Sequence, residues 1–167
     1  MKPREPALLA IAIGLCAEAI AAGPPVTASL CAPQETTYFS CLVARERSVA
    51  LCGLSGGGVQ YRFGRAAAIE LRFPDASATT TDPLRIAHYS RYQTERFEVR
   101  FENRGTDYVV FDYTEEQRRS AGVRLTMGDG KERELACAGR VHSRMNELQG
   151  LLPCDPDSAL NGGSCPR

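Results

Sequence analysis

The sequence predicts an all-β domain, a small antiparallel meander of about eight strands that closes into a barrel or a sandwich. Three observations support this prediction. Apolar and polar residues alternate along most of the chain, short turns separate the alternating runs, and six cysteines follow the N-terminal segment. We therefore expect one β domain over residues 31–142, followed by a short helix and a disulfide-tied tail over residues 143–167.

An export signal is predicted ahead of the domain, over residues 1–22. Lys2 and Arg4 supply positive charge, and the apolar run from Ala7 to Ala17 is about 11 residues long, as in the core of a signal peptide. A membrane-spanning helix needs roughly 20 apolar residues, so we expect no stable membrane anchor. Small residues that suit signal peptidase place the expected cleavage between residues 21 and 28. The protein is therefore expected to be periplasmic or extracellular.

The first predicted hairpin joins Thr37–Val43 to Ser48–Leu54, because both runs are rich in strand-forming residues. Gly56–Gly58 follow this hairpin. A phosphate-binding loop needs a helix after its glycines, whereas a strand is predicted here. We therefore expect these glycines to form an ordinary loop between hairpins.

The second predicted hairpin joins Val59–Phe63 to Ile69–Phe73. If Phe63, at the end of the first run, lies opposite Ile69, at the start of the second, the large apolar side chains lie on one face. The same register puts Arg62 directly opposite Glu70, a cross-strand ion pair that contributes about 0.2–1 kcal/mol. We predict this register because the core face and the ion pair agree on it.

Four further strands are predicted, and their turns are short. A three-residue loop at Gly128–Gly130 keeps the apolar faces in phase by pairing Val123 with Leu135 and Arg124 with Glu134. Residues 115–119 are expected to form a solvated turn or a short helix, and residues 74–83 a long mobile loop. The strands cover Phe97–Phe101, Tyr108–Tyr113, Gly122–Met127 and Arg133–Cys137.

The one helix is predicted over Ser143–Leu152. Met145, Leu148 and Leu152 would share one face of this helix. We expect that face to pack on the core of the domain.

The cysteines predict a disulfide framework, because an even number of them in an exported domain is typical of paired thiols. Cys154 is expected to pair with Cys165 inside the Pro- and Gly-rich tail. Cys137 is expected to pair with one of three early cysteines, which closes a long loop and stabilises the fold by roughly 4 kcal/mol. The candidate disulfide residues are Cys31, Cys41, Cys52, Cys137, Cys154 and Cys165.

Composition and motifs argue against several classes of function. The formal net charge is zero, whereas nucleic acids and anionic membranes are bound by clustered Lys and Arg. The chain has two histidines and no CxxC pair, so no metal site is expected. It has no HExxH motif. Gly53-Leu54-Ser55-Gly56-Gly57 has the GxSxG spacing, but a nucleophile elbow needs a helix after it and a strand is predicted here, so we expect no cofactor and no catalytic residues.

One segment, His88-Tyr89-Ser90-Arg91-Tyr92, combines aromatic and basic residues. The simpler interpretation is an ordinary strand with its rim. The alternative is a binding surface formed by the candidate residues His88, Tyr89, Arg91 and Tyr92.

Several segments spread over about residues 31–142 resemble a family of secreted or periplasmic bacterial proteins of uncharacterised function. This resemblance implies a secreted protein and brings no activity with it. The matching segments are Phe39-Ser40-Cys41, Ser48–Cys52, Gln60–Gly64, Glu70–Pro74, Tyr108–Val110, Gly122-Val123 and Leu135–Gly139.

A more distant resemblance is to the periplasmic c-type lysozyme inhibitors, which are small β-barrels. The chain is similar to them in its early cysteine, its aromatic-x-Cys strand, its Tyr-rich middle and its late Leu-x-Cys. Those inhibitors carry a Ser-Gly-x-x-Tyr-x-x-Gly motif, and the nearest segment here, His88–Tyr92, lacks both glycines. The resemblance therefore implies an architecture and no inhibitory residues.

We expect a non-catalytic binding or inhibitor-type protein of the cell envelope, whose partner is another envelope or extracellular protein. One alternative is a structural or adhesive envelope component. A second alternative is an enzyme whose catalytic residues are dispersed along the chain, as the two acids of a glycosidase can be.

Overall fold

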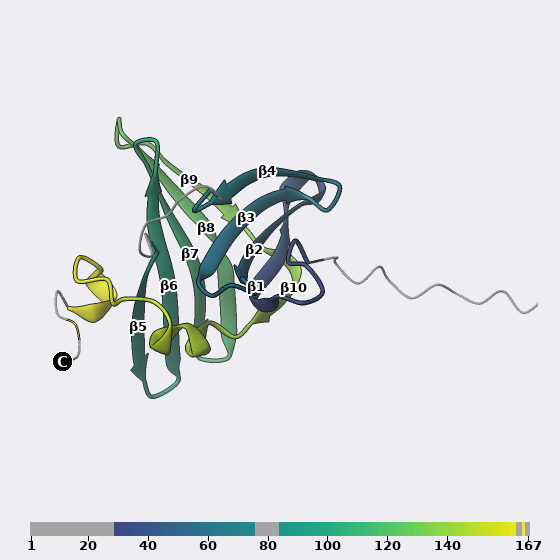
Figure 1. Ribbon diagram of the computed structural model, residues 1–167. Helices are drawn as coiled ribbons and strands as arrows, with labels where there is room; N and C mark the ends of the chain where they lie inside the picture. The colour runs from purple at the N-terminus through teal and green to yellow at the C-terminus, as the bar shows by residue number, and fades with distance from the viewer. Residues whose placement is uncertain (1–28, 76–83, 163–164, 166–167) are drawn as a thin grey trace, which may run out of the picture.

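The computed structural model describes residues 29–75, 84–162 and 165 (Figure 1). The predicted export signal, and all of the predicted 74–83 loop except its first two residues, lie outside this part of the chain.

The described residues form ten strands in two antiparallel sheets of five (Figure 1). The first sheet has the order β10-β1-β2-β3-β4 and the second β5-β6-β7-β8-β9. The strands are β1 (Thr36–Val43), β2 (Arg47–Gly53), β3 (Val59–Arg65), β4 (Ala68–Phe73), β5 (Arg85–Arg91), β6 (Thr94–Asn103), β7 (Thr106–Glu115), β8 (Arg118–Met127), β9 (Glu132–Ala136) and β10 (Ala138–Ser143). Three short 3-10 helices accompany them: η1 (Ala44–Glu46), η2 (Met145–Gly150) and η3 (Ala159–Asn161).

The two sheets form a sandwich and do not close into a barrel, which decides between the two predicted architectures. Strand β9 runs into β10 at Cys137, so the chain crosses from the second sheet to the first at this corner. On the opposite side, β4 and β5 end their sheets and are not paired with each other. Strand β10 is additional to the eight predicted ones. Strand β5 contains most of the His88–Tyr92 segment, for which an ordinary strand was one of the two interpretations.

The core lies between the sheets and is built from the alternating residues of the predicted strands. Phe39, Leu51, Val99, Val110 and Val123 have no solvent-exposed surface. Burial of each such side chain stabilises the fold by about 1.5–3 kcal/mol.

The predicted register of the second hairpin is wrong by two residues. Phe63 pairs with Leu71 rather than with Ile69, because the register shifts at a bulge between Phe63 and Gly64. The apolar face is unchanged, since a shift of two residues preserves it. Arg62 lies opposite Arg72, and Glu70 instead accepts a hydrogen bond of 2.7 Å from Arg47.

The register of the 122–137 hairpin is confirmed. Val123 pairs with Leu135 and Arg124 with Glu134. The three-residue loop is closed by a hydrogen bond of 2.8 Å from Gly130 N to Met127 O, and Gly130 has the expected left-handed backbone (φ 80°). The predicted hairpin of β1 and β2 and the predicted strands within β6 and β7 are also confirmed.

The disulfide predictions are confirmed. Cys154 pairs with Cys165, and Cys137 pairs with Cys41 across 96 residues of sequence. The remaining pair is Cys31–Cys52.

The predicted C-terminal helix is shorter than expected. Ser143 ends β10, and the helix is the 3-10 segment η2, which begins at Met145. The predicted apolar face packs on the core as expected, because Met145, Leu148 and Leu152 are all buried. No helix within the described residues has the length and hydropathy needed to span a membrane.

The tail after η2 protects the edge of β5. Ile86 N donates to Pro153 O at 2.9 Å, and Asp155 N donates to Ile86 O at 2.8 Å. This short parallel bridge satisfies backbone groups that an edge strand otherwise leaves open.

Candidate functional site

The hairpins β5–β6 and β7–β8 extend beyond η2 at one end of the second sheet (Figure 1). We call residues 91–94 and 115–118, which form the two turns, the hairpin end. Glu116 N donates to Gln93 O at 2.9 Å and so ties one turn to the other. Positive φ angles at Gln93, Glu116 and Gln117 keep both turns tight.

The hairpin end carries side chains of the types that dominate protein-binding surfaces. Tyr92 is 87% exposed. The Arg118 side chain is 88% exposed, and its only carboxylate neighbour among the described residues is Glu116, at 4.0 Å. Tyr and Arg are enriched among residues that contribute most to binding energy.

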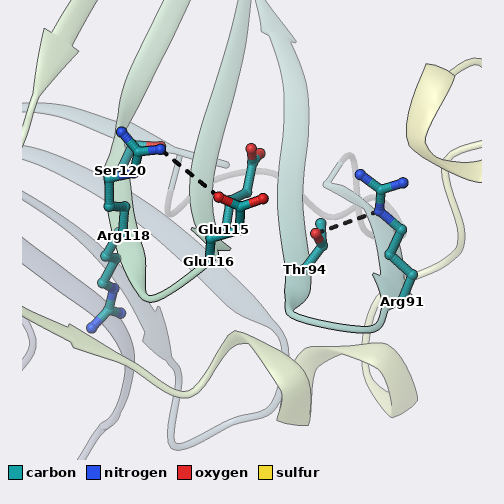
Figure 2. A pocket seen from close by; sticks show the side chains of 7 residues that line it. Arg91, Thr94, Glu115, Glu116, Arg118 and Ser120 are labelled. Atoms are coloured by element: carbon teal, nitrogen blue, oxygen red, sulfur yellow. Dashed lines mark hydrogen bonds and ion pairs between the residues drawn. The ribbon is translucent and has the colours of Figure 1, made fainter.

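A hollow of about 510 Å³ lies behind the turns (Figure 2). Thr94 and Ser120 line it with hydroxyl groups, and Arg91 Nε donates to Thr94 Oγ1 at 3.4 Å. Glu115 accepts a hydrogen bond of 2.7 Å from Arg96, so its charge is already balanced. Arg91 forms no ion pair with any described carboxylate, which leaves a cationic group at the rim of the hollow.

The structure divides the four predicted binding residues between two faces of β5. His88 shares its face with Phe97, on which its ring stacks at 4.4 Å, and Tyr89 and Arg91 point to the other face because side chains alternate along a strand. Tyr92 lies in the turn. Arg91 and Tyr92 therefore belong to the hairpin end, Tyr89 lies beside it, and His88 does not take part.

His88 instead belongs to a polar cluster on the face of the sheet that bears the core. Its Nε2 lies 2.5 Å from Glu95 Oε1, and Ser90 Oγ donates to Glu95 Oε2 at 2.7 Å. The hydrogen bond from Ser90, together with His88, holds the pKa of the Glu95 carboxyl below its ordinary value. Since the serine bonds to the carboxylate and not to the imidazole, the histidine does not activate it as a nucleophile.

The contribution of the β7–β8 turn to the hollow was not predicted from the sequence. Glu115, Arg118 and Ser120 line the hollow, whereas residues 115–119 were expected only to be a solvated turn or a short helix. The missing information is the order of the strands. Because β6 pairs with β7 along its length, the two turns meet at one end of the sheet.

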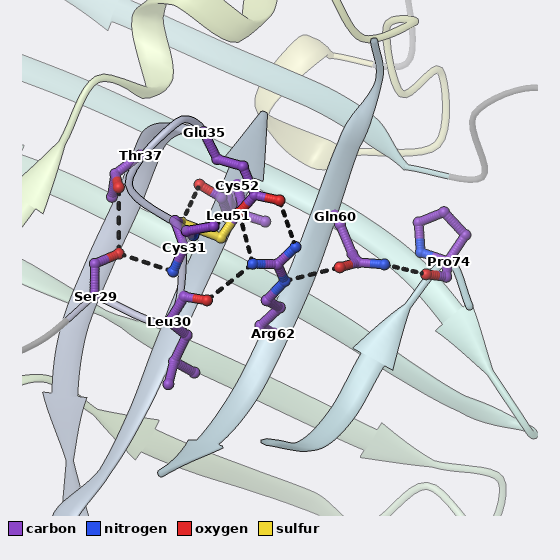
Figure 3. A network of polar contacts seen from close by, with 11 residues as sticks. Ser29, Leu30, Cys31, Glu35, Thr37, Leu51, Cys52, Gln60, Arg62 and Pro74 are labelled. Carbon is purple, nitrogen blue, oxygen red and sulfur yellow. Dashed lines mark hydrogen bonds and ion pairs between the residues drawn. A yellow bond between two sulfur atoms is a disulfide. The ribbon is translucent and has the colours of Figure 1, made fainter. Parts of the chain in front are cut away.

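A second polar network lies on the outer face of the first sheet and supports the fold (Figure 3). The Arg62 guanidinium donates to both Glu35 oxygens, at 2.7 and 2.8 Å, and to Leu30 O at 2.9 Å. Glu35 also lies near the sulfurs of Cys31 and Cys52 at metal-ligand spacing. Those sulfurs are bonded to each other, and metals bind thiolates, so this cluster is not a metal site.

No protein-family model, no curated protein and no solved structure matches this chain. The resemblances drawn from the sequence therefore stay predictions, and a functional assignment depends on the hairpin end and the surface around it.

Proposed function

We propose that this protein is an exported, non-catalytic binding protein of the cell envelope that contacts another envelope or extracellular protein through the hairpin end. The observation that carries the proposal is the exposed Tyr92 beside arginines on two turns that are bonded to each other. An inhibitor-type protein needs such a surface, since it caps its partner without transforming it.

Rigidity supports this function. A surface that is already held in its binding conformation loses less entropy when the partner binds. Here, paired strands hold both turns, and three disulfides cross-link the domain. Disulfides of this kind are typical of proteins in oxidising compartments outside the cytosol.

Wall-degrading enzymes are the first partner class to test. Most glycoside hydrolases use a pair of carboxylates that flank the scissile bond. Guanidinium groups bind carboxylates strongly, often through two hydrogen bonds. The arginines of the hairpin end would therefore find complementary charge in such a cleft.

The test measures turnover by a panel of lysozymes and other wall-degrading enzymes, with binding followed by calorimetry. The wild-type protein is expected to bind and inhibit at least one of them. Tyr92→Ser is expected to weaken binding by tenfold or more, as loss of a central aromatic contact does. Met127→Ser, at an exposed position outside the hairpin end, serves as the matched control and should bind as the wild type does.

Absence of binding and unchanged rates across the whole panel would count against this partner class. If the protein binds an enzyme but Tyr92→Ser binds equally well, the hairpin end is not the contact surface. Circular dichroism of each variant establishes that it is folded before it is compared.

A further inference from the structure

We propose that a groove across the outer face of the second sheet binds a linear glycan that bears carboxylates. This ligand goes beyond the protein contact proposed for the turns, and the two sites share hairpin-end residues such as Arg91, Glu115 and Arg118. It consists of the hollow behind the hairpin end and two further hollows that adjoin it, and we call the three together the arginine groove.

The three hollows share their walls. Arg91 lines both the first hollow, which is shown in Figure 2, and a second of about 600 Å³ beside Tyr89 and the tail around η3. Ser120 lines both the first hollow and a third of about 520 Å³ beside Arg140. The groove therefore crosses β5 to β8, which is about 14 Å at the usual spacing of strands, and continues to β9 and β10 at the corner between the sheets. An extended ligand suits this length better than a compact one.

The groove concentrates positive charge on a protein whose formal net charge is zero. Its lining includes five arginines and three glutamates. Among the described residues, neither Arg91 nor Arg140 forms an ion pair with a carboxylate. These two guanidiniums lie at separate places in the groove, so we infer a ligand with more than one negative charge along its length.

A bulge in β10 accounts for the position of Arg140. The pairing of β10 with β1 shifts between Cys41 and Leu42, and Gly139 and Arg140 are the extra residues. Gly139 adopts a left-handed conformation (φ 77°), which a residue with a side chain rarely accepts. Bulges of this kind reorient a side chain and often lie beside functional sites.

A glycan fits this groove better than an acidic peptide does. One common way in which an extended peptide binds a sheet is by adding its main chain to a free strand edge. Strands β6 and β7 are paired on both sides, so the middle of the groove offers side chains only. Those side chains include the hydroxyls of Thr94 and Ser120 and several guanidiniums, which suit the hydroxyls and carboxylates of a glycan, beside Glu115 and Glu116, which are paired with arginines. The Tyr89 side chain, which is 37% exposed, adds an aromatic surface at one end.

Calorimetry with three probes tests the proposal on the full chain: hexagalacturonate, neutral hexa-N-acetylchitohexaose and hexaglutamate. Hexagalacturonate is expected to bind at least tenfold more tightly than either of the others. Its affinity should fall as salt is added, because salt screens exposed charges. Arg91→Ser and Arg140→Ser are each expected to weaken it by about tenfold, since each removes a charge-assisted hydrogen bond.

Arg72→Ser is the matched control. It removes one exposed arginine from β4 in the other sheet, and hexagalacturonate should bind it as tightly as it binds the wild type. Equal binding of hexaglutamate would point to a peptide ligand, and equal binding of the neutral probe would exclude a role for charge. Either of these two results would overturn the proposal. It would also be overturned if hexagalacturonate did not bind, or if Arg91→Ser and Arg140→Ser both bound it as tightly as the wild type does. Tyr92→Ser separates the two proposals, since it should weaken the protein contact and leave the glycan affinity unchanged.

Discussion

At the scale of single residues, Arg62 and Glu35 form the most enclosed ion pair among those described. Their side chains are only 10% and 9% exposed, and Gln60 accepts a further hydrogen bond from Arg62 Nε at 2.8 Å. We expect Glu35→Gln to lower the free energy of unfolding by about 3 kcal/mol at pH 7, because it leaves a buried guanidinium without its counter-charge. Urea titration measures this loss.

The pH dependence gives an independent check. The hydrogen bond from Arg62 lowers the pKa of the Glu35 carboxyl from its ordinary value of 4.5. A lowered pKa in the folded state contributes stability that is present above the unfolded pKa and is lost as the pH falls through the folded value. The loss in the free energy of unfolding caused by Glu35→Gln should therefore be smaller at pH 3 than at pH 7.

The control is Glu70→Gln, whose exposed pair with Arg47 predicts a loss under about 1 kcal/mol. A loss for Glu35→Gln that is the same at both pH values would contradict this account.

At the scale of elements, the β3–β4 hairpin depends on Gly64. A Cβ added at this position would lie 2.6 Å from Ala68 O and 2.6 Å from Glu70 N, and the φ angle is 140°. We expect Gly64→Ala to lower the free energy of unfolding by at least about 2 kcal/mol, since backbone atoms must move to admit the methyl group. Gly56→Ala is the matched control, because nothing lies within 4 Å of its added Cβ. Equal urea midpoints for the two variants would contradict this prediction.

The bulge between Phe63 and Gly64 marks a limit of prediction from sequence. Alternation with a period of two predicts which face of a strand is buried, and it did so for Phe63 and Leu71. It cannot detect a shift of two residues, and the attractive pairing of Arg62 with Glu70 favoured the wrong register.

The candidate site could be predicted from the sequence only in part, for a related reason. Arg91 and Tyr92 were found from local composition, whereas Arg118 joins them only through the order of the strands.

At the scale of the whole molecule, one disulfide joins the two ends of the domain. Cys41 lies in β1 and Cys137 at the corner between β9 and β10, and 96 residues separate them in sequence. In the chain-entropy model, a loop of this length stabilises the fold by about 4.7 kcal/mol, and the 11-residue separation of Cys154 and Cys165 corresponds to about 3 kcal/mol. The long bridge should therefore matter more than the bridge of the tail.

Paired alanine variants test this ranking. Replacing Cys41 and Cys137 together is expected to lower the urea midpoint more than replacing Cys154 and Cys165 together does. The tail variant should still fold, because η2 and the core residues of both sheets remain in place. Alkylation of the wild-type protein, purified under non-reducing conditions, should label none of the six described cysteines, since all are paired. Labelling of Cys41 or Cys137 in that experiment would mean that the corner between the sheets is held by packing alone, and the larger loss predicted for the long bridge would then have no basis.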